Sequence, residues 1–505
     1  MKLQCLLGPE MTAAAASGET EIAGVTADSR QVQRGWLFAA LAGGRADGAR
    51  FIPEAIARGA AAILVGRGSG ISAPEDVPEH VPVDVPEHVP EHLPGHVPVL
   101  TAAEPRQALA MLAARFYPAQ PDTIVAITGT SGKTSTADFT RQLFAHLGHK
   151  AASLGTLGLI TPDGSVYGGL TTPDPVALHR TLHELATNGV THLALEASSH
   201  GLDQHRLDGV RLKAAAFTNL GRDHLDYHPS MEAYLAAKLR LFTELLPAGA
   251  PAVVNADAEH AGKVIAAARA RFRTVMSVGR SGETLRLEAV VRDGFSQRLH
   301  VTYDGRSCEL HFPLPGDYQA CNALLAAGLA IAAGEAASRV LRALGQLKGV
   351  RGRLEIVGRV RGGLIVIDYA HKPDALKAAL EALRRFAPGR IICVLGCGGD
   401  RDRGKRPMMG RIAAELADLV IVTDDNPRSE RPETIRAEIL AGCSRAREIA
   451  DRAEAIRAGV RLLGAGDVLL IAGKGHETGQ IVGTTVLPFS DHEAVHAALS
   501  EIIDV

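Results

Sequence analysis

The segment Ile124–Ser135, with the sequence IVAITGTSGKTS, holds the residues best suited to chemistry in this chain. A short apolar run leads into a glycine-rich turn, and an amphipathic helical pattern follows the turn. The N–H groups of such a turn converge on anionic oxygens, Lys133 adds positive charge, and the Thr134 hydroxyl is suited to Mg²⁺. The segment therefore predicts a nucleotide phosphate site formed by Gly129, Thr130, Ser131, Gly132, Lys133, Thr134 and Ser135.

The spacing of the glycines departs from that of a strict Walker A loop. Such a loop needs a glycine five residues before Gly132, and Ile127 occupies that position. The alternative is a glycine turn that only caps a helix. A strand before the turn and a helix after it favour a shortened phosphate loop.

Polar clusters follow other apolar runs of the middle region. Glu196 ends the run HLALE, and His224 lies in the segment NLGRDHLDYH that follows AAAFT. Each has an ordinary alternative, because a glutamate can cap a helix and a histidine can be satisfied within a loop. Both runs are expected as strands beside the phosphate-loop strand, so the two side chains together can offer oxygen and imidazole ligands to Mg²⁺ near a nucleotide.

The length of the chain and its patterning predict an α/β fold with three domains. At 505 residues the chain is too long for a single core. Residues 1–118 have the pattern of a small α/β module, whereas 119–349 and 350–505 alternate apolar runs with helical patterns. Strands separated by helices indicate mostly parallel sheets with ligands at the carboxyl ends of the strands. We expect a central P-loop-type domain and a Rossmann-like C-terminal domain that share a site across their cleft.

Composition argues against several classes of partner. The 54 basic and 56 acidic residues nearly cancel, which does not favour nucleic acid or anionic lipid. The six cysteines are scattered without metal-ligand spacing, so we expect free thiols in a reducing cytoplasm. The sequence has no export signal and no run of 18 apolar residues. We expect a cytoplasmic monomer that acts on small molecules.

The stretch Val77–Val99 is a degenerate repeat rich in proline and histidine. Its prolines exclude a helix or a central strand and favour extended conformation. The histidines could bind metal adventitiously, but a solvated surface insertion is the simpler interpretation. We assign it no catalytic role.

A series of motifs runs the length of the chain: GTSGKTS, LEASSHGLDQHRLDG, NLGRDHLDYH, AAK, LPGDYQACNALLA, GVRGRLE, DYAHKPDAL, GCGGDRDRGKRP, DDNPRSE and GKGHE. Their order and approximate spacing resemble those of the Mur ligase family. These enzymes use ATP to form the amide bonds of the peptidoglycan stem peptide in the cytoplasm. The resemblance covers essentially the whole sequence.

The motif DDNPRSE resembles that of family members that add meso-diaminopimelate. This amino acid has a distal carboxylate that the guanidinium of Arg428 could bind bidentately, whereas lysine has none. A polar turn capped by Asp425 and fixed by Pro427 would explain Asn-Pro but not the arginine beside it. The resemblance assigns diaminopimelate binding to Arg401, Asp425, Asn426, Pro427, Arg428, Gly473 and Glu477.

The resemblance also assigns the other two substrates. For ATP it implies Asn322 at the adenine, Arg353 at the phosphates, and Asp368 with His371 at the ribose. Near residues 43–46 the family's uridine-binding pattern is not matched, and Leu170 replaces an asparagine often found before the paired threonines. The residues that match the family's UDP-dipeptide site are Ser29, Thr171, Thr172, Ser198, Gln204 and Arg206.

Lys238 depends most on the resemblance, because a lysine on an amphipathic helix is ordinarily a solvated surface charge. In the family the matching lysine is carbamylated and helps to hold a second Mg²⁺. The resemblance thus implies two Mg²⁺ ions held by Thr134, Glu196, His224 and carbamylated Lys238, with Lys133, Glu196, His224 and Lys238 as the catalytic group.

The function that the resemblance implies is ATP-dependent ligation in peptidoglycan synthesis, and hence in cell-wall biogenesis, cell shape and cell division. Meso-diaminopimelate would be joined to UDP-N-acetylmuramoyl-L-alanyl-D-glutamate through an acyl phosphate. Three alternatives stay open: a related ligase that adds L-lysine or D-alanyl-D-alanine, a folylpolyglutamate synthetase, and, from another class, a P-loop kinase or NTPase.

Overall fold

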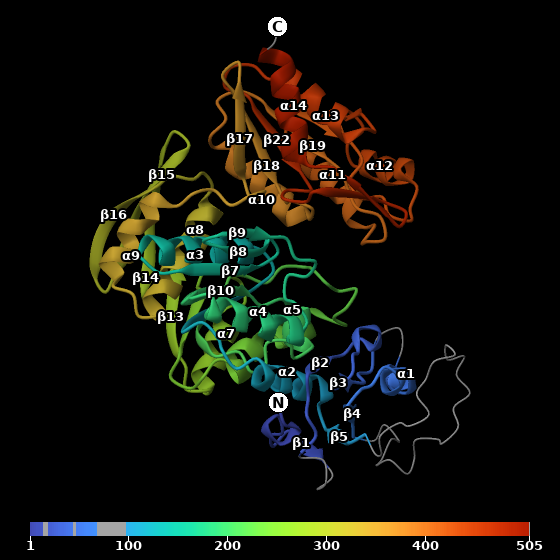
Figure 1. Cartoon of the computed structure of the whole chain (residues 1–505). Coiled ribbons are helices and arrows are strands. Elements are labelled where there is room, and N and C mark those ends of the chain that lie inside the picture. Colours follow the sequence, from blue (N-terminus) through green and yellow to red (C-terminus); the bar gives the residue numbers. More distant parts are fainter. Residues whose placement is uncertain (14–18, 44–46, 68–96, 504–505) are drawn as a thin grey trace.

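A computed structural model describes residues 1–13, 19–43, 47–67 and 97–503. Three bodies follow one another along the chain, from the blue N-terminal part through the green and yellow centre to the red C-terminal part (Figure 1). Their main sheets have five, eleven and six strands. Residues 44–46 of the uridine region and 77–96 of the proline- and histidine-rich repeat lie outside the described residues.

The N-terminal sheet has the order β1-β5-β4-β3-β2, with β1 antiparallel to β5 and the other pairs parallel. Its elements are β1 Met11–Ala13, β2 Gly24–Thr26, β3 Trp36–Ala39, α1 Ile52–Ala57, β4 Ala62–Gly66, β5 Val99–Ala102 and α2 Pro105–Phe116. Val99, the last residue of the predicted insertion, pairs with Ile63 in the middle of this sheet. Val99 follows the last proline of the repeat and is therefore free to join the sheet.

The central sheet has the order β16-β15-β14-β13-β12-β11-β6-β10-β7-β8-β9. Its parallel part is formed by β6 Thr123–Thr128, β7 Ala151–Gly155, β10 His192–Glu196, β11 Leu212–Phe217, β12 Pro251–Asn255 and β13 Thr274–Gly279. The strand β14 Leu285–Asp293 pairs parallel with β13 and antiparallel with the next strand. Antiparallel strands then extend the sheet at both ends: β8 Gly158–Thr161, β9 Gly164–Val166, β15 Ser296–Tyr303 and β16 Arg306–Phe312. The phosphate-loop strand β6 lies between β10 and β11, which confirms the α/β class with a mostly parallel central sheet.

Helices cover both faces of the central sheet (Figure 1). They are α3 Lys133–His146, α4 Pro175–Thr187, α5 Ser199–Asp203, α6 Met231–Arg240, α7 Ala261–Ala270, α8 Asp317–Ala332 and α9 Ala337–Ala343. Because both faces are covered, the parallel strands are continuous apolar runs rather than alternating ones. The Ser230 hydroxyl caps α6 by accepting from the Ala233 N–H at 3.2 Å. This cap fixes the start of the helix that carries Lys238.

The C-terminal sheet has the order β17-β18-β22-β19-β20-β21, with β17 as its antiparallel edge. Its strands are β17 Glu355–Val360, β18 Gly363–Asp368, β19 Ile391–Leu395, β20 Leu419–Val422, β21 Arg447–Glu448 and β22 Val468–Ala472, followed by the hairpin of β23 Gly479–Val482 and β24 Thr485–Pro488. Helices α10 Pro373–Arg384, α11 Lys405–Leu416 and α12 Pro432–Leu440 pack in one core, and α13 Arg452–Leu462 and α14 Asp491–Ile503 in another.

The central and C-terminal parts contact each other both at the strand ends and away from them. The Phe295 ring stacks on Phe386 with 6.1 Å between centroids, and Arg385 forms an ion pair with Asp317. Arg292 also donates to the Arg385 carbonyl at 2.8 Å. Within the described ranges, no helix combines the length and the apolar character needed to cross a membrane.

Candidate active site

The phosphate loop joins β6 to α3, and two of its glycines are required by close packing. Gly129 has φ 142° and Gly132 has φ 87°. A Cβ atom at Gly129 would lie 1.9 Å from Thr218 Oγ1, and one at Gly132 would lie 2.4 Å from Asn322 Oδ1. The loop can therefore bring its backbone close to its neighbours only because these side chains are absent.

Two lysines, the half-buried Lys133 and the buried Lys238, meet at this loop. Lys133 Nζ donates to the carbonyl oxygens of Gly129 at 2.9 Å and Thr130 at 3.1 Å. Lys238 Nζ donates to the same Gly129 oxygen at 2.9 Å, and the residue is 1% exposed. Burial lowers the pKa of Lys133 to about 8; burial and then the charge of Lys133 lower the pKa of Lys238 well below its ordinary value. The surface interpretation of Lys238 is therefore wrong, because α6 turns this side chain into the loop.

Glu196 ends β10 beside the phosphate loop and is 1% exposed. Its Oε2 accepts from Thr134 Oγ1 and from Thr156 Oγ1, both at 3.2 Å, and its Oε1 accepts from the Thr156 N–H at 2.8 Å. A buried carboxylate beside a hydroxyl is a donor set that suits Mg²⁺. The parallel pairing of β10 with β6 places Glu196 level with Ile127, next to the start of the loop.

His224 lies after β11 with φ 53°, a left-handed conformation. Its Nε2 is 3.1 Å from Asp223 Oδ2, and burial lowers its pKa to about 4. Its ring lies 6.1 Å from that of Tyr234, while Lys238 Nζ lies 4.3 Å from the same Tyr234 ring. The structure thus brings the imidazole of His224 and the amine of Lys238 to one tyrosine.

The C-terminal part contributes cations to the phosphate loop. Arg353 Nη2 donates to Thr134 Oγ1 at 3.2 Å, and Lys372 forms an ion pair with Asp223. Sequence reasoning missed Lys372 and Asp223, although both lie within quoted motifs. The only signal for them was their position in DYAHKPDAL and NLGRDHLDYH.

Three other predicted ATP residues surround Arg353. Asn322 donates to Gln319 Oε1 at 3.1 Å, and Gln319 donates to the Arg353 carbonyl at 3.0 Å. Asp368 accepts from the Leu354 N–H at 2.6 Å, and burial raises its pKa to about 6. His371 Nδ1 lies 2.7 Å from the Tyr369 carbonyl. Asn322 is thus packed against Gly132 of the loop, while Asp368 ends β18 and His371 lies shortly after that strand.

A second cluster lies at the carboxyl ends of β20 and β22, around Lys474, which is fully buried. Lys474 Nζ donates to Asn426 Oδ1 at 2.9 Å and to Glu477 Oε2 at 3.2 Å, and lies 3.6 Å from Asp425 Oδ1. Asn426 Nδ2 also donates to Glu477 Oε2 at 2.9 Å. Gly473 allows this approach, because a Cβ there would lie 2.6 Å from Asp425 Oδ2. Sequence reasoning quoted GKGHE but did not assign Lys474.

Arg428 follows this cluster in a left-handed conformation with φ 51°. Its N–H donates to the Ile481 carbonyl at 3.0 Å, and its carbonyl accepts from the Gly483 N–H at 2.8 Å, so the β23–β24 hairpin fixes its backbone. Its Nη1 donates to the Gly399 carbonyl at 2.8 Å. Arg401 is exposed and donates to the Asp400 carbonyl at 3.4 Å. The Pro427 carbonyl packs against Gly399.

A groove of about 470 Å³ lies between the N-terminal part and the central part. Asp28, Gln204 and Arg206 line it, and so do Arg106 and Arg180, which sequence reasoning missed. The side chain of Ser29, by contrast, donates to Glu54 Oε2 at 3.0 Å and is buried. The arginines supply the local positive charge that a nearly neutral chain needs to bind an anion.

Hydrogen bonds connect this groove to Glu196. Arg206 Nη1 donates to the Thr172 carbonyl at 2.7 Å, and Thr172 Oγ1 donates to the Glu196 carbonyl at 2.8 Å. Ser198 donates from its backbone N–H to Thr172 Oγ1 at 3.0 Å, and Thr171 Oγ1 lies 3.2 Å from Thr156 Oγ1. The paired threonines thus lie between the groove and the phosphate loop.

Comparisons with known families cover most of the chain. The model described as "Mur ligase family, catalytic domain" matches residues 21–117. The "Mur ligase middle domain" matches residues 127–330, and "Mur ligase, glutamate ligase domain" matches residues 352–475.

Curated relatives and solved structures agree with these matches. The chain is 57% identical to UDP-N-acetylmuramoyl-L-alanyl-D-glutamate--2,6-diaminopimelate ligase of Bradyrhizobium diazoefficiens over 99% of each chain, and 53% identical to that of Rhizobium meliloti, again over 99% of each. A solved structure of a ligase of the same name is 31% identical with a TM-score of 0.70, covering 100% of this chain and 99% of the other. The MurF ligase of Thermotoga maritima in complex with ADP, 20% identical with a TM-score of 0.62, covers 96% of this chain and 98% of its own and shares the fold. The chain belongs to the Mur ligase family.

Proposed function

We propose that this chain is an ATP-dependent ligase that adds meso-diaminopimelate to UDP-N-acetylmuramoyl-L-alanyl-D-glutamate in peptidoglycan precursor synthesis. The observation that carries the proposal is a continuous line of contacts from the phosphate loop to the Lys474 cluster. Arg353 donates to Thr134, its guanidinium lies 4.4 Å from the centroid of the Tyr369 ring, and the Tyr369 hydroxyl donates to Glu477 Oε1 at 3.4 Å. In support of the proposal, the phosphate loop and the Lys474 cluster lie side by side in a chain that is 57% identical to a ligase of this name.

The chemistry that such a site must perform is activation of a carboxylate. A carboxylate does not react with an amine, because oxide would have to leave. In the proposed reaction, an oxygen of the D-glutamyl γ-carboxylate attacks the γ-phosphorus of ATP, and ADP leaves. The diaminopimelate amine then attacks the acyl carbon, its C–O bond to phosphate breaks, and the amine loses a proton as the amide forms. The protein contributes positioning and charge stabilisation rather than a nucleophile.

The residues around the phosphate loop take the phosphate roles. Lys133 and Arg353 neutralise the transferring phosphoryl group, and Asn322, Asp368 and His371 hold the nucleoside. A further set of residues directs the UDP-dipeptide from the groove toward Glu196, and Ser29 lies at the end of this set farthest from Glu196. The other members of the set are Thr171, Thr172, Ser198, Gln204 and Arg206. In support of this direction, Arg206 both lines the groove and contacts Thr172.

The Lys474 cluster takes the amine. Asp425 and Glu477 supply the negative charge that suits an ammonium group, with Asn426 and Gly473 beside them. Arg428 and Arg401 bind the distal carboxylate of diaminopimelate, because a guanidinium pairs with a carboxylate through two hydrogen bonds. Lysine has no such carboxylate.

The donor sets also fit Mg²⁺. Thr134 and Glu196 would hold one ion, and His224 and carbamylated Lys238 a second. Bound Mg²⁺ supplies charge neutralisation at phosphate oxygens. In support of carbamylation, burial and Lys133 favour the neutral amine of Lys238, the form that reacts with CO₂.

We further propose domain boundaries at 1–118, 119–349 and 350–505, and a cytoplasmic monomer.

A panel of amino acids incubated with ATP and UDP-dipeptide, with mass spectrometry of the product, tests the proposed function. The diaminopimelate adduct is the expected product, and phosphate should be released only when dipeptide and amine are both present. Release without either substrate would indicate an NTPase, and a lysine or dipeptide adduct would indicate a sister ligase.

A further inference from the structure

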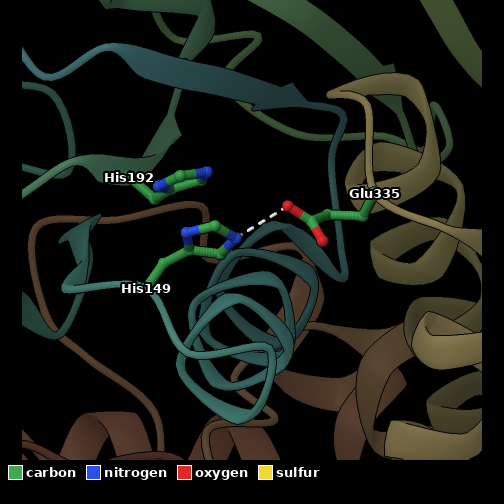
Figure 2. A group of neighbouring side chains, drawn as sticks. All are labelled: His149, His192 and Glu335. Carbon is green, nitrogen blue, oxygen red and sulfur yellow. Dashed lines mark hydrogen bonds and ion pairs between the residues drawn. The ribbon is translucent and has the colours of Figure 1, made fainter.

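A group of three metal-type ligands lies at the opposite edge of the central sheet from the ATP site. His149 follows α3, His192 is the first residue of β10, and Glu335 follows α8. His149 Nε2 is 2.7 Å from Glu335 Oε1, and one ligand atom from each residue lies within 4.8 Å of the others. Figure 2 shows the two imidazoles one above the other, each with a nitrogen directed toward the side on which the Glu335 carboxylate lies.

The two imidazole rings stack on each other, and neighbouring side chains limit how they can turn. Their centroids are 3.8 Å apart with 26° between the planes, and the Phe144 ring packs 4.6 Å from that of His192. Thr191 Oγ1 lies 2.9 Å from His192 Nδ1, which leaves Nε2 as the nitrogen available to a ligand. A hydrogen bond to one ring nitrogen is the usual way in which a protein orients a metal-binding histidine.

The backbone at all three positions is also fixed. The N–H groups of Thr191 and His192 both donate to the Lys150 carbonyl, at 3.0 and 3.2 Å, and the His149 N–H donates to the Phe144 carbonyl at 3.0 Å. The Glu335 N–H donates to the Ala330 carbonyl at 3.1 Å. Only side-chain adjustment is then needed to bring the three donors to about 2.0–2.2 Å from one ion.

We propose that His149, His192 and Glu335 form a binding site for a zinc-type divalent cation. Two imidazoles and one carboxylate are a donor set that selects Zn²⁺ or Co²⁺ over Mg²⁺, which prefers oxygen. The side chains of His149 and Glu335 are 30% and 16% exposed, so an ion has access and water can complete its coordination.

The role of this site is structural. Roughly 13 Å of strand separate His192 from Glu196 at the active-site end of β10. The ion would join the ends of α3, β10 and α8. The other parts of these three elements carry Lys133, Glu196 and Asn322, respectively. Because it binds the folded chain, it would raise the unfolding temperature without taking part in ligation.

The test is zinc binding by the full chain after removal of metals with a chelator. Equilibrium dialysis with Zn²⁺ compares the wild type with His192→Ala and Glu335→Gln. The control is His300→Ala, because His300 pairs with Glu309 at 3.5 Å much as His149 pairs with Glu335. The histidines of the 77–99 repeat and the ATP-site ligands are the same in all four proteins, so their zinc binding cancels in the comparison.

The wild type and His300→Ala should bind one more equivalent of Zn²⁺ than His192→Ala. Glu335→Gln should weaken binding at this site at least about tenfold, since even partners of metal ligands are worth that much. Zinc should raise the melting temperature of the wild type more than that of either site variant. Equal stoichiometry and affinity in all four proteins would overturn the proposal. If His192→Ala does not fold, Glu335→Gln decides alone, because it keeps the shape of the side chain and its hydrogen bond to His149.

Discussion

Lys133 and Lys238 donate hydrogen bonds to the same carbonyl oxygen, that of Gly129, each with 2.9 Å between Nζ and oxygen. Burial, and after it the charge of Lys133, lowers the pKa of Lys238 well below its ordinary value, because a nearby cation disfavours a second positive charge. The two lysines therefore suit different tasks. Lys133 suits the task of a cation that faces phosphate, and Lys238 suits that of a neutral amine.

Replacing Lys133 by alanine should abolish ligation, because the phosphate loop loses the cation closest to the transferring phosphoryl group. Stabilisers of phosphoryl charge are worth on the order of 10³-fold or more in turnover. The measurement is phosphate release with all three substrates present. Lys213→Ala, an exposed lysine of neighbouring β11, is the matched control and should leave the rate unchanged. Near-normal turnover of Lys133→Ala would remove the loop from the mechanism.

Replacing Lys238 by alanine should leave the enzyme nearly inactive, and added acetate or another short carboxylate should restore part of the activity. The carboxylate would take the place of the carbamate. Lys238→Arg, which keeps a positive charge but forms no carbamate, should be equally inactive. The rate is measured against carboxylate concentration, with ATP binding and circular dichroism as checks on folding. A folded, ATP-binding alanine variant that carboxylates do not rescue would speak against carbamylation.

Arg428 should set the choice of amine. Its truncation leaves the distal carboxylate of diaminopimelate without its partner, at a cost of roughly 2–5 kcal/mol, or about 30-fold to several thousand-fold. Arg428→Ala should raise KM for meso-diaminopimelate steeply and leave KM for ATP and UDP-dipeptide nearly unchanged. The rate with lysine as the amine substrate is already poor and should fall little further. The preference for meso-diaminopimelate over lysine should therefore narrow.

The control for Arg428 is Arg431→Ala, because the side chain of Arg431 is 86% exposed three residues further on. This variant should behave like the wild type with both amines. If Arg428→Ala depresses the rates with diaminopimelate and lysine equally, Arg428 is a residue of structure or closure and does not select the substrate.

Lys474→Met should damage both stability and amine binding. The substitution leaves two carboxylates and the Asn426 oxygen facing one another without their shared cation, and removal of one partner from such a buried group costs about 3–5 kcal/mol. Unfolding in urea should shift to lower concentration, and KM for diaminopimelate should rise. Lys377→Met, at a lysine that is 58% exposed and pairs loosely with Glu381, is the control. Wild-type values of both quantities would contradict the assigned role of Lys474.

Much of this architecture could be predicted because strand ends are marked in the sequence. HLALE ends at Glu196 and forms β10 with the expected bounds, and the apolar run before Gly129 forms β6. Continuous apolar runs bounded by glycine and polar residues are what a parallel sheet covered on both faces requires. The extension formed by β14, β15 and β16 was not predicted. Its half-exposed strands alternate apolar and polar residues and do not form continuous apolar runs.

The side-chain contacts were harder to predict than the strands. The burial of Lys238 depends on which face of α6 meets the loop. The periodicity of the helix alone favoured a solvent-exposed position for this side chain. Lys474 and Lys372 gave no signal beyond their presence in motifs, because their roles arise from partners 48 and 149 residues away. His149 and Glu335, 186 residues apart, were likewise not recognisable as a pair.

Oxygen transfer during one turnover tests the proposed reaction most directly. UDP-dipeptide labelled with ¹⁸O in the D-glutamyl γ-carboxylate is incubated with ATP and meso-diaminopimelate, and phosphate and amide are analysed by mass spectrometry. Attack of the carboxylate on ATP predicts one ¹⁸O in the released phosphate and one retained in the diaminopimelate amide. Unlabelled phosphate would show that water attacks ATP, as in an NTPase, and would contradict ligation through an acyl phosphate.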